Sequence, residues 1–393
     1  MESSTAPSTP DEPQNRFLAL WNMTSKRMRS ACGLVIFLGL TIWLSLPSIK
    51  TMTVPQVSLH YGVKSPFNHT KVALLIENRP NPILAPLMLH FMAVVPPDWR
   101  FRFMGSEESV AHINQSMAIR EHVNSGKLDL TFIPSNMSTA GQEMISRFLT
   151  NLWLYETVLH PAEWLLVFQT DSMLCANSRH NINDFLEFDW IGAPWNPSSR
   201  WGGNGGLSLR RVSAIIDVLR EQVRVDNSEP EDVWLTERLA HRPGARTANS
   251  TISIVFSGEG FVGEKVKVGS NSDAFNSSLD AAAAGEYVPE LDSWRDGFYE
   301  PMGYHTGGSG AYLHGPVWGK PSLRKHIWDY CPEIKMTLAM DAAEYIPGHC
   351  NDVWRRDGSE AQVEAELDAR YPFGSEIIDG EEHPLLPPGL SAW

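Results

Sequence analysis

The sequence has few cysteines and no excess of basic residues. Its four cysteines include no Cys-x-x-Cys pair, and no Cys/His set has the spacing of a structural zinc site. The 32 basic against 46 acidic side chains give a formal charge of −14. The chain therefore lacks the positive surplus that neutralises nucleic-acid phosphates, and we expect no nucleic-acid partner. No internal repeat is visible.

The composition instead favours a folded protein. Of 393 residues, 42% are hydrophobic and 20% are charged, which predicts a packed core and excludes wholesale disorder and collagen-like structure. The length suits one large α/β domain with accessory segments. The 14 tryptophans suit both protein cores and the faces of sugars.

An uncharged run lies near the N-terminus. Ala31–Ile49 would span roughly 29 Å as a helix, close to the hydrocarbon thickness of a bilayer. Lys26, Arg27 and Arg29 precede it, so the positive-inside rule predicts a single-pass type II membrane protein with a cytosolic N-terminus. A cleaved signal peptide and a buried core helix are the alternatives. The bulk of the chain would then lie in the lumen of the Golgi or the endoplasmic reticulum.

Two further features fit such a lumenal domain. Cys331 and Cys350 are close in sequence and could form a disulfide in an oxidising compartment. Five Asn-x-Ser/Thr sites predict glycosylated surface positions: Asn68, Asn114, Asn136, Asn249 and Asn276.

The sequence divides into five parts. These are a disordered tail (1–30), the anchor (31–49), a stem (50–70), a folded domain (71–355) and an acidic tail (356–393). A low-complexity insertion is expected at 264–290, and the stretch 357–382 carries nine acids and one base, typical of a solvated segment.

Short apolar runs alternate with helical patterns in the folded domain. This order predicts a mostly parallel sheet with helices on both faces. The expected strands are Val72–Ile76, Arg100–Met104, Leu128–Ile133, Trp164–Phe168 and Asp189–Ala193. The expected helices are Leu87–Val94, Ser146–Leu159, Arg210–Val223 and Glu231–Ala240, with a glycine-rich loop at Trp201–Gly206.

Asp171 directly follows the strongest predicted strand. An acid there lies at the carboxyl edge of a parallel sheet, where ligands bind in open α/β folds. It could hold Mg²⁺ or Mn²⁺, with substrate phosphates completing the shell. A helix N-cap or a solvated loop acid explains its position equally well.

Three other features could carry chemistry. The glycine segment Gly203-Asn204-Gly205-Gly206 would let a backbone approach a ligand, although a flexible turn or a degenerate Rossmann fingerprint would look similar. Glu231-Asp232 could supply a general base, or could merely favour a helix start. His305 could bind a metal, but a lone histidine is more often structural.

Together these motifs resemble the largely fungal domain-of-unknown-function family DUF5672, whose members are similar to glycosyltransferases of the GT-A fold. The resemblance covers roughly residues 71–350. The matching segments are Glu77–Arg79, Phe168–Ser172, Trp190–Trp195, Gly203–Arg210, Pro230–Val233, Phe256–Glu259 and Gly303–His305.

The resemblance implies a role for each site residue. Gln169-Thr170-Asp171 lies where such enzymes carry an Asp-x-Asp motif for metal and nucleotide sugar, but Gln169 replaces the first acid. By the same resemblance, His305 completes the metal site and Asp232, beside Glu231, is the base. The glycine segment shapes the cleft, and Glu77 and Arg79 meet the nucleotide.

These observations predict an inverting, metal-dependent glycosyltransferase with a GT-A-like fold. It would transfer a sugar from a nucleotide-sugar donor to a hydroxyl of a glycan, protein or lipid. A catalytically inactive lumenal protein that binds glycans or a partner is the alternative. A glycoside hydrolase, which needs two facing carboxylates, is a third. All the transferase roles require Asp171, Asp232, His305 and the glycine segment to meet at one cleft.

Overall fold

The computed structural model describes residues 25–51, 65–266, 291–338, 374–378 and 380–385. The chain divides into two units, residues 1–64 and 65–393. In the first unit, helix α2 (Lys26–Thr51) covers the run predicted as an anchor. Among the described residues, no helix combines the length and apolar character needed to cross a membrane. The single-pass anchor predicted at Ala31–Ile49 is therefore not supported.

A six-stranded mixed sheet forms the centre of the second unit, in the order β3-β2-β1-β4-β7-β6. Strands β1 to β4 run parallel, whereas β7 is antiparallel to both β4 and β6. The strands are β1 (Asn68–Ile76), β2 (Trp99–Gly105), β3 (Leu128–Phe132), β4 (Trp164–Phe168), β6 (Trp190–Gly192) and β7 (Leu207–Arg211).

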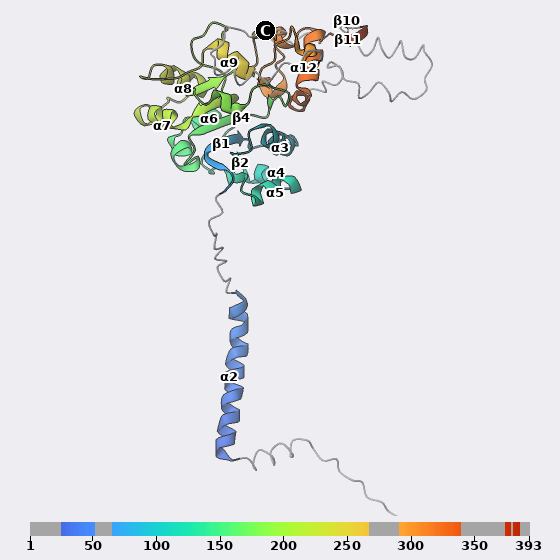
Figure 1. The fold of residues 1–393 in the computed structure, drawn as a ribbon. Coiled ribbons are helices and arrows are strands. Elements are labelled where there is room, and N and C mark those ends of the chain that lie inside the picture. Colours follow the sequence, from blue (N-terminus) through green and yellow to red (C-terminus); the bar gives the residue numbers. More distant parts are fainter. Residues whose placement is uncertain (1–24, 52–64, 267–290, 339–373, 379, 386–393) are drawn as a thin grey trace, which may run out of the picture. The chain divides into compact units, whose positions relative to one another are not determined.

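Helices cover both faces of this sheet, as the alternation of the sequence predicted (Figure 1). Successive side chains of β1 point to opposite faces, so Val72 and Leu74 join the core under α6, α7 and α8, while Ala73 and Leu75 join the core under α3. The helices are α3 (Leu84–Val94), α4 (Glu107–Ile113), α5 (Met117–Asn124), α6 (Gly141–Leu149), α7 (Val212–Glu221), α8 (Glu231–Ala240), α9 (Ser250–Phe256), α11 (Gly315–Trp318) and α12 (Pro321–Tyr330).

A second, three-stranded sheet extends the carboxyl edge of the first. It consists of β5 (Ser172–Leu174), β9 (Gly303–His305) and β8 (Ser257–Gly258), in the order β5-β9-β8. Three residues separate the end of β4 from the start of β5, and Ser172 pairs with His305 in the antiparallel β5–β9 register. This pairing brings a residue far along the chain to the end of the central strand.

Some expectations about elements were wrong. Leu207–Arg211 forms strand β7, where a loop running into a helix at Arg210 was expected, and α7 begins only at Val212. The helix expected over Ser146–Leu159 is broken after α6 and resumes as a π-helical turn at Leu154–Val158. The acidic tail, in which no strand was expected, contains a hairpin of β10 (Ser375–Ile378) and β11 (Glu381–Pro384), and its solvated character stays a prediction.

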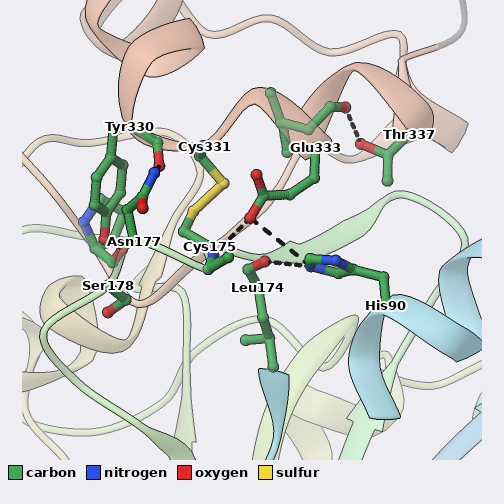
Figure 2. Close-up of a disulfide and its surroundings, with 12 residues drawn as sticks. His90, Leu174, Cys175, Asn177, Ser178, Tyr330, Cys331, Glu333 and Thr337 are labelled. Atoms are coloured by element: carbon green, nitrogen blue, oxygen red, sulfur yellow. Dashed lines mark hydrogen bonds and ion pairs between the residues drawn. A yellow bond between two sulfur atoms is a disulfide. The ribbon is translucent and has the colours of Figure 1, made fainter. Parts of the chain in front are cut away.

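The disulfide also differs from the expected one. Cys331 pairs with Cys175, not with Cys350, and the bond joins the end of β5 to the end of α12 across 156 positions (Figure 2). Next to it, the Glu333 carboxylate accepts a hydrogen bond from the backbone N–H of Ala176. Cys350 lies outside the described residues, and so does most of the insertion expected at 264–290.

Most of the predicted glycosylation positions are at the surface. Asn114, Asn136 and Asn249 are exposed and Asn68 is half-buried, whereas Asn276 lies outside the described residues. The predicted surface placement is thus confirmed for the three exposed sites.

Candidate functional site

Asp171 and His305 face each other at the carboxyl edge of the central sheet. Asp171 follows β4 and is 6% exposed, and His305 ends β9 and is 5% exposed. His305 Nε2 lies 3.4 Å from Asp171 Oδ1. The other carboxylate oxygen of Asp171 accepts a hydrogen bond of 2.9 Å from the N–H of Ser309. The two residues predicted to share a metal are therefore in contact.

A second carboxylate lies on the other side of the imidazole. Glu259 Oε1 is 3.2 Å from His305 Nδ1. Burial would lower the pKa of His305, but its contacts with Asp171 and Glu259 raise it to about 10. Burial likewise acts to raise the pKa of Asp171, yet the contact with His305 outweighs it and lowers that pKa. The cluster thus holds a cationic imidazole between two carboxylates.

The glycine segment packs directly against this cluster. A β-carbon added at Gly206 would collide with His305 Nε2 and lie 2.8 Å from Gln169 Oε1, so only glycine fits between these side chains. Asn204 donates a hydrogen bond of 3.3 Å from Nδ2 to Glu259 Oε1 and accepts one of 2.7 Å from the N–H of Gly206. The segment therefore links Gln169, Glu259 and His305.

Asp232 contacts the same segment from the opposite side. Its Oδ2 accepts a hydrogen bond of 3.0 Å from the N–H of Gly205, and its Oδ1 accepts one of 2.9 Å from the N–H of Val233 in the first turn of α8. Burial raises the pKa of Asp232, against the lowering effect of these two N–H groups. As a residue, Asp232 is half-buried.

Glu231 has a different environment. It is 5% exposed, and its Oε1 accepts a hydrogen bond of 2.8 Å from the fully buried Arg210. Arg210 also donates to the backbone oxygen of Gly205 at 3.0 Å and to Ser208 Oγ at 2.9 Å. Burial raises the pKa of Glu231 to about 7, although Arg210 opposes this. Through Arg210, Glu231 therefore supports the backbone of the glycine segment.

The remaining predicted residues lie at the same sheet edge. Glu77 follows β1, and its carboxylate accepts hydrogen bonds from the Arg79 guanidinium at 3.0 and 2.8 Å. The side chain of Arg79 is 70% exposed, which leaves it open to solvent. Thr170 is half-buried between Gln169 and Asp171. The structure thus gathers every predicted site residue around one edge, but their individual roles stay predictions.

Three buried atoms of Asp171 and His305 have no hydrogen-bond partner among the described residues: Asp171 Oδ1, His305 Nδ1 and His305 Nε2. The 3.4 Å between Asp171 Oδ1 and His305 Nε2 is close to the roughly 3 Å between adjacent ligands of an octahedral Mg²⁺. Within the described ranges, no three His, Cys, Asp or Glu residues are arranged to hold a metal. The spacing of the pair suits two adjacent ligands of a cation, but His305, which is cationic here, would have to release its proton to bind one.

Residues 127–276 match the family described as "Protein of unknown function (DUF5672)". The resemblance drawn from the sequence motifs is thus confirmed over that part of the chain. None of the curated proteins matches the sequence.

Solved glycosyltransferase structures show a remote likeness. A mannosyltransferase from Pyrobaculum calidifontis, in complex with GDP-Man and Mn²⁺, is 10% identical with a TM-score of 0.34, over 47% of this chain and 56% of that one. Core-mannan synthase A from Aspergillus fumigatus is 7% identical with a TM-score of 0.27, over 43% and 64%. Galactosyltransferase LgtC, in complex with donor and acceptor sugar analogues, is 13% identical with a TM-score of 0.32, over 70% and 98%.

This chain therefore covers less than two thirds of the first two of these proteins. At TM-scores below 0.5 the likeness says nothing of activity.

Sequence reasoning assigned no role to two residues that the site depends on. Glu259 completes the environment of His305, and Arg210 holds Glu231 beneath the glycine segment. Both stood inside matched motifs, Phe256–Glu259 and Gly203–Arg210. Their motif membership was the available signal, but Glu231 lies 21 positions from Arg210, and the partner of Glu259, His305, lies on another strand.

Proposed function

We propose that this chain is a glycosyltransferase that transfers a sugar from a nucleotide-sugar donor to a hydroxyl acceptor with inversion at the anomeric carbon. The observation that carries the proposal is the position of Asp232. It is a partly exposed carboxylate on the same glycine segment that packs against His305 and Asp171. Asp232, the proposed base, and the sheet edge proposed to bind the donor phosphates are thereby separated by only a few backbone atoms of the glycine segment.

The reaction assigns Asp232 the acceptor proton. As the acceptor oxygen bonds to the anomeric carbon, the bond from that carbon to the donor phosphate breaks, and the hydroxyl proton passes to the Asp232 carboxylate. The raised pKa of Asp232 suits a general base better than an ordinary carboxylate would. The N–H groups of Gly205 and Val233 hold the carboxylate in place.

Asp171 and His305 are the residues that would hold a divalent cation, Mn²⁺ or Mg²⁺. Such a cation supplies Lewis-acid stabilisation of the leaving diphosphate. Asp171 Oδ1 would contribute the negative charge, and His305 Nε2 would become a nitrogen ligand only once the imidazole releases its proton. Gln169 replaces an acid at this edge, so the chain itself contributes one charge fewer. Arg79 is exposed toward the same edge and can pair with a donor phosphate.

The test uses the full-length protein with a panel of UDP- and GDP-sugars, with and without Mn²⁺. Nucleotide release measures turnover, and calorimetry measures donor binding. We expect Asp232→Asn to retain donor binding and to lose about 10²–10⁴-fold in turnover. Asp217→Asn, on the exposed face of α7, is the matched control and keeps wild-type turnover. Unchanged turnover in Asp232→Asn would remove this residue from the role.

A non-catalytic, glycan-binding protein is the second candidate. The amide of Gln169 and the ionic contacts of His305 with Asp171 and Glu259 favour it, because both weaken the case for a resident cation. In this case no nucleotide sugar would bind at millimolar concentration, while glycan binding would persist.

We further propose that residues 65–393 lie in the lumen of the secretory pathway, in the Golgi or the endoplasmic reticulum. The Cys175–Cys331 disulfide supports an oxidising compartment, and Asn114, Asn136 and Asn249 are exposed acceptors for glycans. Digestion of the cellular protein with an N-glycosidase should lower its apparent mass. An unchanged mass together with free thiols at both cysteines would contradict the proposal.

A further inference from the structure

A pocket of about 360 Å³ lies beside the candidate base and is not used by the mechanism above. Its lining includes Trp195, Arg200, Trp201, Val233, Thr236 and Glu237. The volume falls at the lower end of the roughly 300–1,000 Å³ typical of small-ligand sites.

One wall of the pocket is an indole that is held on one side and open on the other. The Trp195 ring packs on Gly202, where an added β-carbon would lie 2.7 Å from Cζ3. Gly202 has φ +95°, a conformation that only glycine adopts easily. Even so, Trp195 is 39% exposed. The ring is thus fixed by its contact with Gly202 while its remaining surface faces solvent.

A second tryptophan is fixed by polar contacts at the pocket. Trp201 Nε1 donates a hydrogen bond of 3.4 Å to Glu237 Oε2, and its ring meets His241 edge to face with centroids 5.3 Å apart. Two positioned indoles cost little conformational entropy when a ligand binds.

The pocket adjoins Asp232 along α8. Thr236, which lines the pocket, is one turn after Asp232, and its hydroxyl donates a hydrogen bond of 2.7 Å to the Asp232 backbone oxygen. On the other side, Trp201 and Gly202 lead directly into the glycine segment that binds Asp232. Asp232 and the glycine segment therefore lie between the tryptophan pocket and His305.

We infer that this pocket binds one pyranose ring of a neutral glycan acceptor. The C–H groups on a sugar face carry partial positive charge and are attracted to the negative face of an indole ring. Arg200, Glu237 and Thr236 supply donors and acceptors for hydroxyl groups at the rim. One basic and one acidic side chain leave the pocket without a net charge, which favours a neutral sugar over a uronic or sialic acid.

This inference rests on the proposed function, because it places the acceptor next to Asp232. Its test separates the two. Saturation-transfer NMR of the full-length protein with the methyl pyranosides of mannose, galactose and glucose measures sugar binding, and calorimetry measures donor binding. Methyl glucuronide and methyl sialoside are the acidic probes.

We expect Trp195→Ala to weaken binding of the neutral pyranosides at least tenfold, with donor affinity unchanged. Trp294→Ala is the matched control, because Trp294 is also 39% exposed but lies at a tilt to the ring of His326, outside the pocket. Arg200→Ala changes an exposed side chain and provides a second variant should Trp195→Ala fail to fold. It should weaken the same sugars severalfold.

Several outcomes would overturn the inference. They are absence of pyranoside binding to the wild type, equal binding by wild type and both pocket variants, and a preference for the acidic probes. If donor turnover is normal while the pocket variants bind as wild type, the inference fails and the transferase stands. If the wild type binds no donor but Trp195→Ala loses the sugar, the pocket stands and the transferase fails.

Discussion

Two buried charged clusters flank the glycine segment, and they differ in how completely they are bonded. Next to Gly205, Arg210 makes three hydrogen bonds, to Glu231, Ser208 and the Gly205 backbone, although its Nη1 has no partner among the described residues. Next to Gly206, neither ring nitrogen of His305 has a hydrogen-bond partner among the described residues, and its two carboxylate neighbours stand 3.2 and 3.4 Å away as ion pairs. We call the first the closed cluster and the second the open cluster, because the longer contacts of His305 leave more to gain from a ligand than the 2.8 Å contact of Arg210.

The adjacent acids of α8 repeat the same contrast. Glu231 is buried in the closed cluster, whereas Asp232 is half-buried and, among the described residues, accepts hydrogen bonds from the backbone N–H groups of Gly205 and Val233. A sequence pair that looks like two equivalent candidates for a base therefore divides into one residue that supports the glycine segment and one that stays the candidate base.

The largest loss of stability should come from breaking the closed cluster of Arg210, Glu231 and Ser208. Arg210→Met leaves the Glu231 carboxylate buried without its cation, so we expect a loss of about 3–5 kcal/mol in the free energy of unfolding, measured by urea denaturation. Arg220→Met, which breaks the pair of Glu156 with the 61% exposed Arg220 side chain, should cost at most about 1 kcal/mol. Equal losses of unfolding free energy in the two variants would mean that the buried Arg210–Glu231 pair stabilises the fold no more than an exposed pair does.

The second-largest effect should come from the open cluster of His305, Asp171 and Glu259. Asp171→Asn keeps an oxygen for the N–H of Ser309 but removes the charge, so Mn²⁺ affinity should fall by at least the roughly 10–100-fold lost with an outer-sphere partner. Titration of Mn²⁺ followed by electron paramagnetic resonance measures this directly. Asp98→Asn, which disturbs only the pair with Lys71, is the control. Equal Mn²⁺ affinity in both variants would remove Asp171 from the metal site.

The difference between local pattern and long-range pairing explains how much of the site could be predicted from the sequence. Apolar runs and the acid after the strand Trp164–Phe168 placed Asp171 at a sheet edge, because strand burial and edge position follow from local pattern. The pairing of β5 with β9, which brings His305 there, is a long-range register that no local pattern encodes. The meeting of the two was predicted only through family resemblance.

Long-range contacts also account for the errors. Cys175 and Cys331 are 156 positions apart, so proximity in sequence pointed to the wrong partner for Cys331. Leu207–Arg211 follows four glycines and precedes a helix, and it becomes a strand only because β4 and β6 offer it backbone partners. In each case tertiary pairing overrode the local signal.

A smaller effect is expected where the open cluster meets the glycine segment. In Gly206→Ala, the new methyl group would collide with His305 Nε2, so we expect overpacking to cost about 1–3 kcal/mol and to displace the imidazole. Gly315→Ala meets no atom within 4 Å and is the matched control. Urea denaturation gives the cost, and the NMR shift of the His305 ring reports its displacement. A wild-type shift in Gly206→Ala would contradict the close packing.

The smallest effect concerns a third ion pair, between Arg224 and Glu143 of α6. The buried Arg224 side chain donates to Glu143 at 2.7 Å, and with the N–H of Asn227 and Arg147 it lowers the pKa of Glu143 to about 2. A carboxyl with a lowered folded-state pKa contributes stability above its ordinary pKa of about 4.5 and loses that contribution as the pH falls toward 2. The difference in Tm between wild type and Glu143→Gln should therefore be largest at neutral pH and shrink below about pH 4.5. A difference that is the same at pH 7 and pH 3 would show that the charge of Glu143 does not contribute to the stability of the fold.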